Sequence, residues 1–320
     1  MLVIIGCCLM RSSFWRFITR AGRFPSARCT VGVALFVLAA TVPGRAAVVS
    51  WDGGGGDGAW QTAANWSGNT LPGAADDVVI NVAGPVTVSL ASGSVTIKSL
   101  QCANGLELNG GDLTLTAGAS SIQGSLLLNG GQLSVRGATS TLTATGPATH
   151  EGSSLAVSAG AQMRISNLGR LSHTNNGAIR LTSEGAGSLL ELPDVTEFAV
   201  VDYYQLQLQA TGGGRVRLPS LSSALGALSA SASDTNSAVE LTAFTGRLAN
   251  PAPGNARLEA YGGGAVLIPN VTALEAVDVT LQGASQIPLA QLDQYRGQRP
   301  ERMGWSGAHP GRHPTARADE

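Results

Sequence analysis

Cysteine is almost absent from the body of this chain. Of the four cysteines, Cys7, Cys8 and Cys29 lie in the N-terminal region, and only Cys102 lies beyond it. A single cysteine cannot form an internal disulfide, and no cysteine or histidine pair has the spacing of a zinc site. The stability of the body must therefore come from packing and backbone hydrogen bonding.

Aromatic and charged residues are also scarce, at 5% and 13% of the chain. Segments with helical periodicity are rare, which argues against Rossmann folds, α/β barrels and α/β-hydrolases, because these folds need regular crossover helices. The remainder is rich in glycine, alanine, serine, threonine, leucine and valine. This composition is typical of many short strands separated by tight turns, so the sequence predicts an all-β fold.

Clusters of basic residues are missing outside the N-terminal region. The formal net charge of −1 is the sum of +6 over residues 1–47, −9 over residues 48–295 and +2 over residues 296–320. Nucleic-acid binding depends on clustered lysine and arginine that contact phosphates. An acidic body with scattered basic residues therefore predicts no nucleic-acid partner and no binding to an anionic membrane.

The N-terminal segment has the composition of an export signal. Several arginines precede an apolar run at Val31–Val42, and small residues follow it. This run is too short to cross a bilayer, which takes roughly 20 residues. We therefore expect a signal peptide at 1–47, no transmembrane span in the mature chain, and secretion to the extracellular space or cell surface. The alternative is a buried N-terminal helix in a cytosolic protein.

Internal repeats dominate the body of the chain. The segment LELNGGDLTL at 106–115 returns twenty positions later as LLLNGGQLSV at 126–135. An Asn-Gly turn is typical of a β-hairpin. A period of about twenty positions is instead typical of one coil of a parallel β-helix, in which each coil buries its faces against its neighbours. We therefore expect Asn109 and Asn129 to lie at equivalent coil corners and to form a hydrogen-bonded ladder.

A second and longer repeat, of about 25 residues, follows downstream and is again in the range of a solenoid coil. Its pattern is apolar-x-apolar-Pro-x-apolar-Ser/Thr, with one copy, Val239–Thr245, that lacks the proline. Proline cannot donate a ladder hydrogen bond, so it belongs at a strand end or a coil corner. The three corner prolines are Pro193, Pro219 and Pro269. A pair of β-sandwich domains is the all-β alternative, but it does not explain either repeat.

These patterns predict a parallel β-helix, or solenoid, with an N-terminal capping segment and a disordered C-terminal tail. The predicted parts are the signal peptide at 1–47, a Trp/Gly-rich cap and first strand at 48–82, coils of about 20 residues at 83–185, coils of about 25 residues at 186–295, and the tail at 296–320. The tail is rich in arginine, glycine and proline and has no alternating apolar run. Such a tail is also typical of a frameshifted or truncated gene product.

The start of the body carries a resemblance to a known family. WDGGGG at 51–56, WQTAANWS at 60–67 and LPGAADDVVI at 71–80, followed by glycine-rich strand repeats, resemble the N-terminus of large secreted β-strand-repeat proteins of bacteria. Those proteins are similar to autotransporter passengers and to giant repeat proteins of planctomycetes. The resemblance covers about residues 48–295 and implies a parallel β-helix at the cell surface. This chain departs from the family in being short and in lacking an identifiable anchoring domain.

The stretch WDGGGGDGAW at 51–60 has three interpretations. In the first it caps the solenoid, because an uncapped first coil would expose an apolar face and unpaired strand edges. The tryptophans that would cover this end are Trp51, Trp60 and Trp66. The glycines would then let the chain double back on itself.

The second interpretation is a calcium site. Its candidate ligands are Asp52, Asp57, Asp76 and Asp77. The glycine/aspartate nonapeptide that binds calcium repeats with a fixed period, whereas this stretch occurs once, and the D-x-D-x-D-G loop is absent. The third interpretation is stacking of a sugar ring on the tryptophans. We favour the cap and expect no cofactor, with calcium as the one candidate ion.

Motifs that would indicate catalysis are absent. The sequence contains no G-x-S-x-G elbow, H-E-x-x-H or Walker loop, all of which carry a defined mechanism. We interpret His150 and His173 as isolated surface histidines. The acidic residues that come closest to a lyase-like cluster are interpreted as solvated turn residues, namely Glu191, Asp194, Glu197 and Asp202.

We therefore expect a secreted, non-enzymatic solenoid with a structural or adhesive role at the cell surface. Its partners would be extracellular glycans or cell-surface proteins, contacted weakly at many points along the coils. The alternative is a carbohydrate-binding or polysaccharide-degrading β-helix protein. Exposed aromatic residues along one face would favour that alternative.

Overall fold

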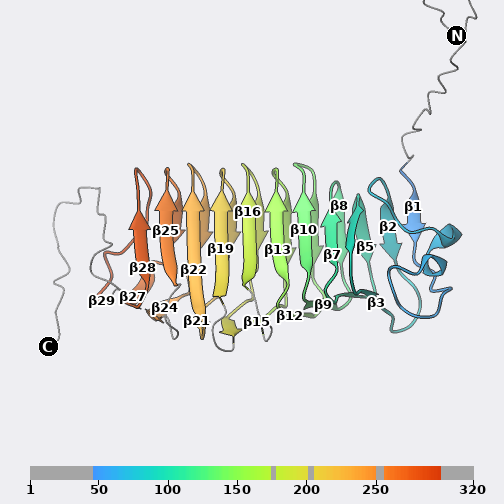
Figure 1. Ribbon diagram of the computed structural model, residues 1–320, viewed down its shortest axis with the longest axis horizontal. Coiled ribbons are helices and arrows are strands. Elements are labelled where there is room, and N and C mark those ends of the chain that lie inside the picture. Colours follow the sequence, from blue (N-terminus) through green and yellow to red (C-terminus); the bar gives the residue numbers. More distant parts are fainter. Residues whose placement is uncertain (1–45, 174–177, 201–204, 250–255, 297–320) are drawn as a thin grey trace, which may run out of the picture. The chain divides into compact units, whose positions relative to one another are not determined.

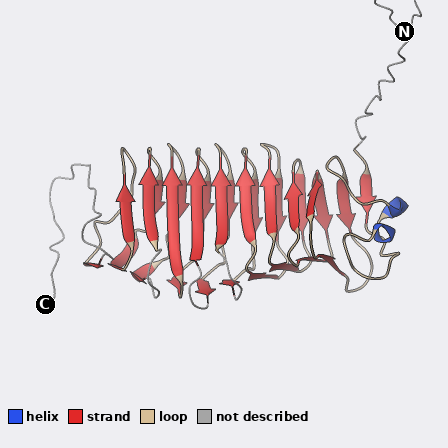
Figure 2. Ribbon diagram, in the orientation of Figure 1, coloured by secondary structure: helices blue, strands red, loops and turns tan. Residues whose placement is uncertain are grey.

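The computed structural model describes residues 46–173, 178–200, 205–249 and 256–296. Nearly all of the predicted signal peptide and of the predicted tail lies outside these described residues. Within them the chain consists of short parallel strands and two short 3-10 helices, η1 (Ala63–Asn65) and η2 (Ser67–Asn69) (Figure 2). Among the described residues, no helix has the length and apolar character needed to span a membrane. The predicted all-β parallel solenoid is confirmed.

Along most of the described chain, successive strands belong in turn to three long sheets, and within each sheet the strands of successive coils lie side by side along the long axis (Figure 1). The ten-stranded sheet contains β1 (Val48–Ser50), β2 (Asp77–Ile80), β5 (Ser99–Cys102), β8 (Ala119–Ile122), β11 (Thr141–Ala144), β14 (Gln162–Ile165), β17 (Leu189–Glu191), β20 (Arg215–Arg217), β23 (Ala238–Glu240) and β26 (Ala265–Leu267). The seven-stranded sheet contains β3 (Thr87–Leu90), β6 (Gly105–Leu108), β9 (Leu126–Asn129), β12 (Ala148–Glu151), β15 (Arg170–His173), β18 (Glu197–Val200) and β21 (Ser223–Ala224).

The third long sheet is nine-stranded. It contains β4 (Ser94–Ile97), β7 (Asp112–Leu115), β10 (Gln132–Arg136), β13 (Ser154–Ser158), β16 (Ile179–Glu184), β19 (Gln205–Thr211), β22 (Ala227–Ser233), β25 (Arg257–Tyr261) and β28 (Asp278–Leu281). A separate three-stranded sheet is formed near the C-terminal end by β24 (Thr245–Ala249), β27 (Asn270–Glu275) and β29 (Gln294–Arg296).

The pairing registers decide between hairpins and coils. Every pairing between these named strands is parallel. Leu106 pairs with Leu126 and Leu113 with Leu133, so each partner lies twenty positions further along the chain. In a hairpin, the two strands on either side of one Asn-Gly-Gly segment would instead pair with each other in antiparallel fashion. The Asn-Gly-Gly segments are therefore coil corners, and the hairpin and sandwich alternatives are wrong.

The coils become longer along the chain. In the ten-stranded sheet, Thr141 pairs with Gln162 at an interval of 21, whereas Gln162 pairs with Leu189 at an interval of 27. In the downstream repeats, each residue pairs with its equivalent one coil later. Leu190 pairs with Val216 at an interval of 26, Val216 with Val239 at 23, and Val239 with Val266 at 27. The lengthening thus begins after β14, ahead of residue 186.

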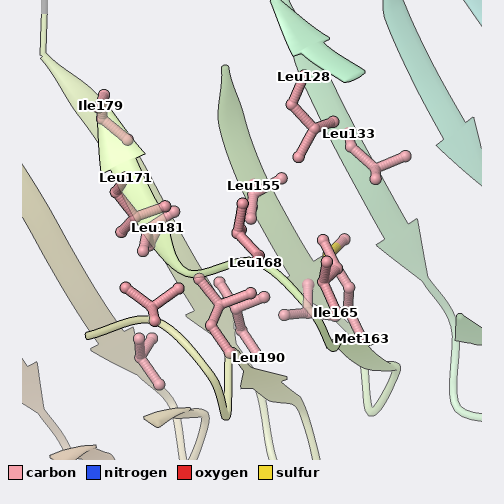
Figure 3. Close-up of a cluster of buried hydrophobic side chains, with 14 of the residues drawn as sticks. Leu128, Leu133, Leu155, Met163, Ile165, Leu168, Leu171, Ile179, Leu181 and Leu190 are labelled. Atoms are coloured by element: carbon pink, nitrogen blue, oxygen red, sulfur yellow. The ribbon is translucent and has the colours of Figure 1, made fainter. Parts of the chain in front are cut away.

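Alternation along each strand builds the hydrophobic interior. In a strand, successive side chains point to opposite faces, and the inward side chains of each sheet stack on their register partners. Leu133 and Leu155 from the nine-stranded sheet and Met163 and Leu190 from the ten-stranded sheet point into one interior (Figure 3). Each of these side chains is at most 1% exposed.

The predicted corner residues lie between sheets. Asn129 Nδ2 donates to Asn109 Oδ1 at 3.1 Å, at the corner where the seven-stranded sheet gives way to the nine-stranded one. Pro193, Pro219 and Pro269 each lie two positions beyond a strand of the ten-stranded sheet. No ladder hydrogen bond from a proline nitrogen is needed at these positions.

Candidate functional site

Three tryptophans close the N-terminal end of the hydrophobic interior. Trp51, Trp60 and Trp66 are 4%, 1% and 0% exposed and belong to the core cluster. The Trp66 ring meets the other two edge to face, with centroids 5.0 Å from Trp51 and 4.8 Å from Trp60. Trp66 Nε1 donates to the Trp60 carbonyl oxygen at 2.7 Å, so its polar atom is satisfied.

The backbone of this segment also extends two of the long sheets. Strand β1 pairs with β2 at the edge of the ten-stranded sheet. Next to β3, Trp60 N donates to the Ser89 carbonyl at 2.9 Å and Ser89 N donates to the Gly58 carbonyl at 2.9 Å. Two sheet edges that would otherwise be open for pairing are thereby occupied at this end.

The oxygens of Asp52 and Asp57 accept hydrogen bonds within the glycine-rich loop. Asp57 Oδ1 accepts from Asn65 Nδ2 at 2.6 Å and from the Ala59 amide at 3.0 Å, and Oδ2 accepts from Thr62 Oγ1 at 2.6 Å. The bonds from Thr62, Ala59 and Asn65 lower the pKa of Asp57. Asp52 Oδ1 accepts from the Gly54 amide at 3.0 Å.

Asp76 and Asp77 accept hydrogen bonds from donors outside the glycine-rich loop. Asp76 accepts from the Ala47 amide at 3.2 Å and from the Gly73 amide at 2.8 Å. Asp77 accepts from Lys98 Nζ at 2.7 Å and from Ser99 Oγ at 2.5 Å, and these two bonds lower its pKa. In the part of the chain that the structure describes, no three His, Cys, Asp or Glu residues are grouped as metal ligands.

We expect millimolar calcium to leave the melting temperature unchanged. Calcium takes six to eight oxygen ligands, whereas the carboxylate oxygens of Asp57 and Asp77 already accept hydrogen bonds from protein donors. Circular dichroism melts of the full chain with calcium or with magnesium at equal ionic strength test this. A rise specific to calcium would contradict the cap interpretation and make Asp52, Asp57, Asp76 and Asp77 the next residues to mutate as candidate ligands.

An arginine–glutamate ladder crosses the outer side of the ten-stranded sheet. We use this name for Arg164, Glu191, Arg217, Glu240 and Arg215. Arg217 Nη1 lies 3.2 Å from Glu191 Oε1, and its Nε lies 3.1 Å from Glu240 Oε2. Arg164 pairs with the other Glu191 oxygen, and Arg215 pairs with Glu240 Oε1.

The ladder corrects one interpretation drawn from the sequence. Glu191 is not a solvated turn residue, because it lies on β17 with its side chain 16% exposed between two arginines. Glu197 begins β18 and lies 3.6 Å from Arg170, while Asp194 is an exposed turn residue that accepts from the Asn167 amide. Asp202 lies outside the described residues. The three acids that the structure describes, Glu191, Asp194 and Glu197, therefore have separate partners and form no common cluster.

The outer side of the nine-stranded sheet differs in character. We call the outward side chains of its strands the polar face, and its middle row the central column. The central column runs through register partners Thr96, Thr114, Ser134, Ala156, Thr182, Gln209, Ser231, Glu259 and Thr280. Its first seven members carry no charge.

Donors and acceptors of the central column are largely not used within the protein. Among the described residues, no hydrogen bond engages the side chains of Thr96, Thr114, Thr182, Gln209 and Ser231. On the ten-stranded sheet, by contrast, Ser121 donates to Gln101 at 2.6 Å and the ladder residues bind each other. The central column therefore offers most of its hydroxyl and amide groups to solvent or to a partner.

No family model, curated protein or solved structure matches this chain.

Two histidines that the sequence suggested were at the surface are buried. His150 is 4% exposed and His173 8% exposed. His150 occupies an inward position of β12, in register with Leu128. Its Nε2 lies 2.8 Å from the Ser153 carbonyl oxygen and its Nδ1 lies 3.2 Å from the Ser172 carbonyl oxygen. The surface interpretation is wrong because an alternating strand turns His150 inward.

Burial lowers the pKa of His150, since the charged imidazolium loses its hydration. The Ser153 and Ser172 carbonyls and the nearby Glu151 carboxylate oppose this shift, whereas a charged His173 adds to it. The unfolded chain thus takes up this proton at a higher pH than the folded chain does. Folding stability is fully present above the unfolded pKa of about 6.5 and falls as the pH drops below it.

We expect the free energy of unfolding to decline between about pH 7.5 and pH 5.5, by at most about 1.4 kcal/mol per pH unit from His150. His150→Leu should remove this slope, because leucine already occupies the neighbouring inward position 128. Urea titrations of both proteins across this range measure it. Equal slopes in the two proteins would show that His150 is not the titrating group.

Proposed function

We propose that this chain is a secreted, non-enzymatic β-solenoid with a structural or adhesive role at a cell surface. The observation that carries the proposal is the polar face, in which nine parallel strands repeat outward polar side chains in register. At roughly 4.8 Å per strand, eight steps extend over roughly 38 Å. Many weak contacts along such a face can add to useful avidity.

Support for the location comes from the N-terminal sequence. The arginine-rich start and the apolar run at Val31–Val42 are typical of an export signal. Expression of the full chain in a bacterial host, followed by fractionation and N-terminal sequencing, tests this part. The exported protein should begin near residue 48 and be accessible to added protease on intact cells. Retention of the whole chain in the cytosol would contradict it.

The adhesive part is tested with the full chain coupled to beads at increasing density. Multivalent attachment predicts that bead adherence to cells rises steeply with density and that soluble monomer competes poorly. A linear dependence, or no adherence at any density, would contradict an adhesive role. A matched bead coated with the unfolded chain controls for nonspecific adherence.

A polysaccharide-degrading protein is the second candidate, and the ladder is the observation that favours it. Glu191 and Glu240 flank Arg217 on an outer sheet surface, and paired carboxylates are the usual groups of glycoside hydrolysis. Both carboxylates, however, are held in ion pairs with arginine side chains, so their oxygens already have partners within the protein. We expect no new reducing ends when the full chain is incubated with polysaccharides. Product formation abolished by Glu240→Gln would establish the second candidate instead.

A further inference from the structure

We infer that the polar face binds a linear, uncharged, hydroxyl-rich polysaccharide that lies along the central column. The inference rests on the proposed adhesive function and names its partner. The face is continuous: the central column passes from β4 to β28 without a register shift in any of its pairings. A partner lying across the strands therefore meets an outward side chain about every 4.8 Å.

Charge argues for an uncharged partner. The nine strands of this sheet carry three arginines and four carboxylates, all on the outer side: Arg136, Arg180, Arg257, Asp112, Glu184, Glu259 and Asp278. The face is thus close to neutral, although residues 48–295 together carry −9. A polyanion would find no excess of positive charge here and would be repelled by the rest of the body.

Hydrogen-bonding capacity argues for a hydroxyl-rich partner. The side chains of Thr96, Thr114, Thr182, Gln209 and Ser231 have hydroxyl or amide groups that no described residue engages. Each of these groups can both donate and accept. The hydroxyls of a sugar polymer also do both, so the two surfaces can pair without leaving a buried polar group unsatisfied.

The same face is poor in the aromatic residues that anchor protein interfaces, and its three arginines lie outside the central column. Interfaces between proteins gain most of their energy from buried aromatic and arginine side chains at the centre of the contact. Tyr261, on β25 near one end of the sheet, is the one aromatic residue in its nine strands, so a sugar polymer would be held here by hydrogen bonds and not by stacking on aromatic rings. The central column between β4 and β22 has only the Ala156 side chain as an apolar member.

The experiment uses the full chain and two isosteric variants that remove hydroxyls. The test variant is Thr96→Val, Thr114→Val and Thr182→Val together. The control is Thr141→Val with Thr143→Val, whose hydroxyls face outward on β11 of the ten-stranded sheet. Valine keeps the volume and the strand preference of threonine, so both variants should fold, and circular dichroism melts check this.

Depletion from solution by cellulose and by chitin measures binding to neutral polymers, and retention on immobilised polygalacturonate and alginate measures binding to anionic ones. We expect binding to at least one neutral polymer, insensitive to salt, with affinity that rises with the length of soluble oligosaccharides. The test variant should bind about tenfold more weakly, from the loss of three modest hydrogen bonds. The control should bind as the unaltered chain does.

Three results would overturn the inference. One is that the unaltered chain adheres to cells but is depleted by none of these neutral polymers. The adhesive role then stands and the partner is a protein, so protease treatment of the cells should abolish the adherence. Equal binding of the test variant and the unaltered chain would move the site away from the polar face. Absence of adherence to cells and of binding to any polymer would overturn the proposed function as well.

Discussion

Replacement of Trp66 by alanine should lower the free energy of unfolding by about 3–5 kcal/mol. The side chain is fully buried, stacks edge to face on Trp51 and Trp60, and fills the N-terminal end of the interior. Its loss leaves a cavity at the N-terminal end of the interior, where no preceding coil covers the first one. Urea unfolding followed by circular dichroism measures the change without depending on tryptophan fluorescence.

Trp66→Phe separates the packing of this side chain from its hydrogen bond. Phenylalanine keeps most of the ring but removes the Nε1 donor to the Trp60 carbonyl, so we expect a loss of about 1 kcal/mol from this bond. The alanine variant should also aggregate more readily, because opening the cap exposes strand edges. A cost below about 1 kcal/mol for Trp66→Ala would show that the segment does not close the interior.

Gly146→Ala should destabilise the fold by about 3 kcal/mol, at the upper end of the usual cost of overpacking. Gly146 lies at the corner between β11 and β12. A Cβ atom there would lie 2.0 Å from the Gly124 carbonyl oxygen and 2.4 Å from the Gln123 carbonyl oxygen, both backbone atoms of the preceding coil. Because the coils are held together by ladder bonds on all three sheets, the backbone cannot simply move away.

Gly169→Ala is the matched control, at the same kind of corner one coil later, between β14 and β15. No atom lies within 4 Å of a Cβ placed there. Alanine restricts the unfolded chain more than glycine does, so this change should leave stability unchanged or raise it by about 0.4–1 kcal/mol. In urea titrations of the two variants, measured side by side, the midpoints should therefore move in opposite directions, or the free energies of unfolding should differ by about 3 kcal/mol. Equal effects would contradict the close stacking of corners.

The coil architecture could be predicted because stacking imposes a period on the sequence. LNGG recurs at 108–111 and 128–131, and the pairing registers reproduce that interval of twenty positions. The prolines were equally informative, since a residue that cannot donate a ladder bond recurs only where the strand has ended. Local alternation then fixes which side chains face inward.

The ladder was missed although its signal was present in the repeats. The middle residue of the apolar-x-apolar pattern is Glu191, then Arg217, then Glu240, so the charge alternates from coil to coil. Proximity in the sequence instead groups Glu191 with Asp194, in the turn after β17, and with Glu197, at the start of β18 in another sheet. In a solenoid, neighbours in space are about one coil apart in the sequence, so equivalent positions must be aligned before charges are compared.

His150 was missed for a related reason. The strands of the seven-stranded sheet have no recognisable sequence repeat around His150, and only their pairing register places His150 beside Leu128.

The central column could not be seen in the sequence because its members differ in residue type and share only their register position in the sheet. Period and alternation therefore predict architecture well, whereas the composition of each outer face emerges only when the strands are stacked in register.

A polymer can lie along the central column only if the polar face is one in-register sheet, and distances between spin labels test this most directly. Labels at Thr96→Cys with Thr182→Cys, and at Thr96→Cys with Ser231→Cys, are separated by four and six strand steps. Cysteines 7, 8 and 29 would be changed to serine. Cys102 can stay, because burial raises the pKa of its thiol to about 12 and leaves it protonated and unreactive.

Double electron–electron resonance should give narrow distributions near roughly 19 Å and roughly 29 Å, a difference of two strand steps. Distances that increase in proportion to the number of strands between the labels would support one regular face along which a polymer can lie. Broad distributions, or a distance between labels at 96 and 231 that is no greater than the distance between labels at 96 and 182, would contradict the stacked solenoid and with it the polar face.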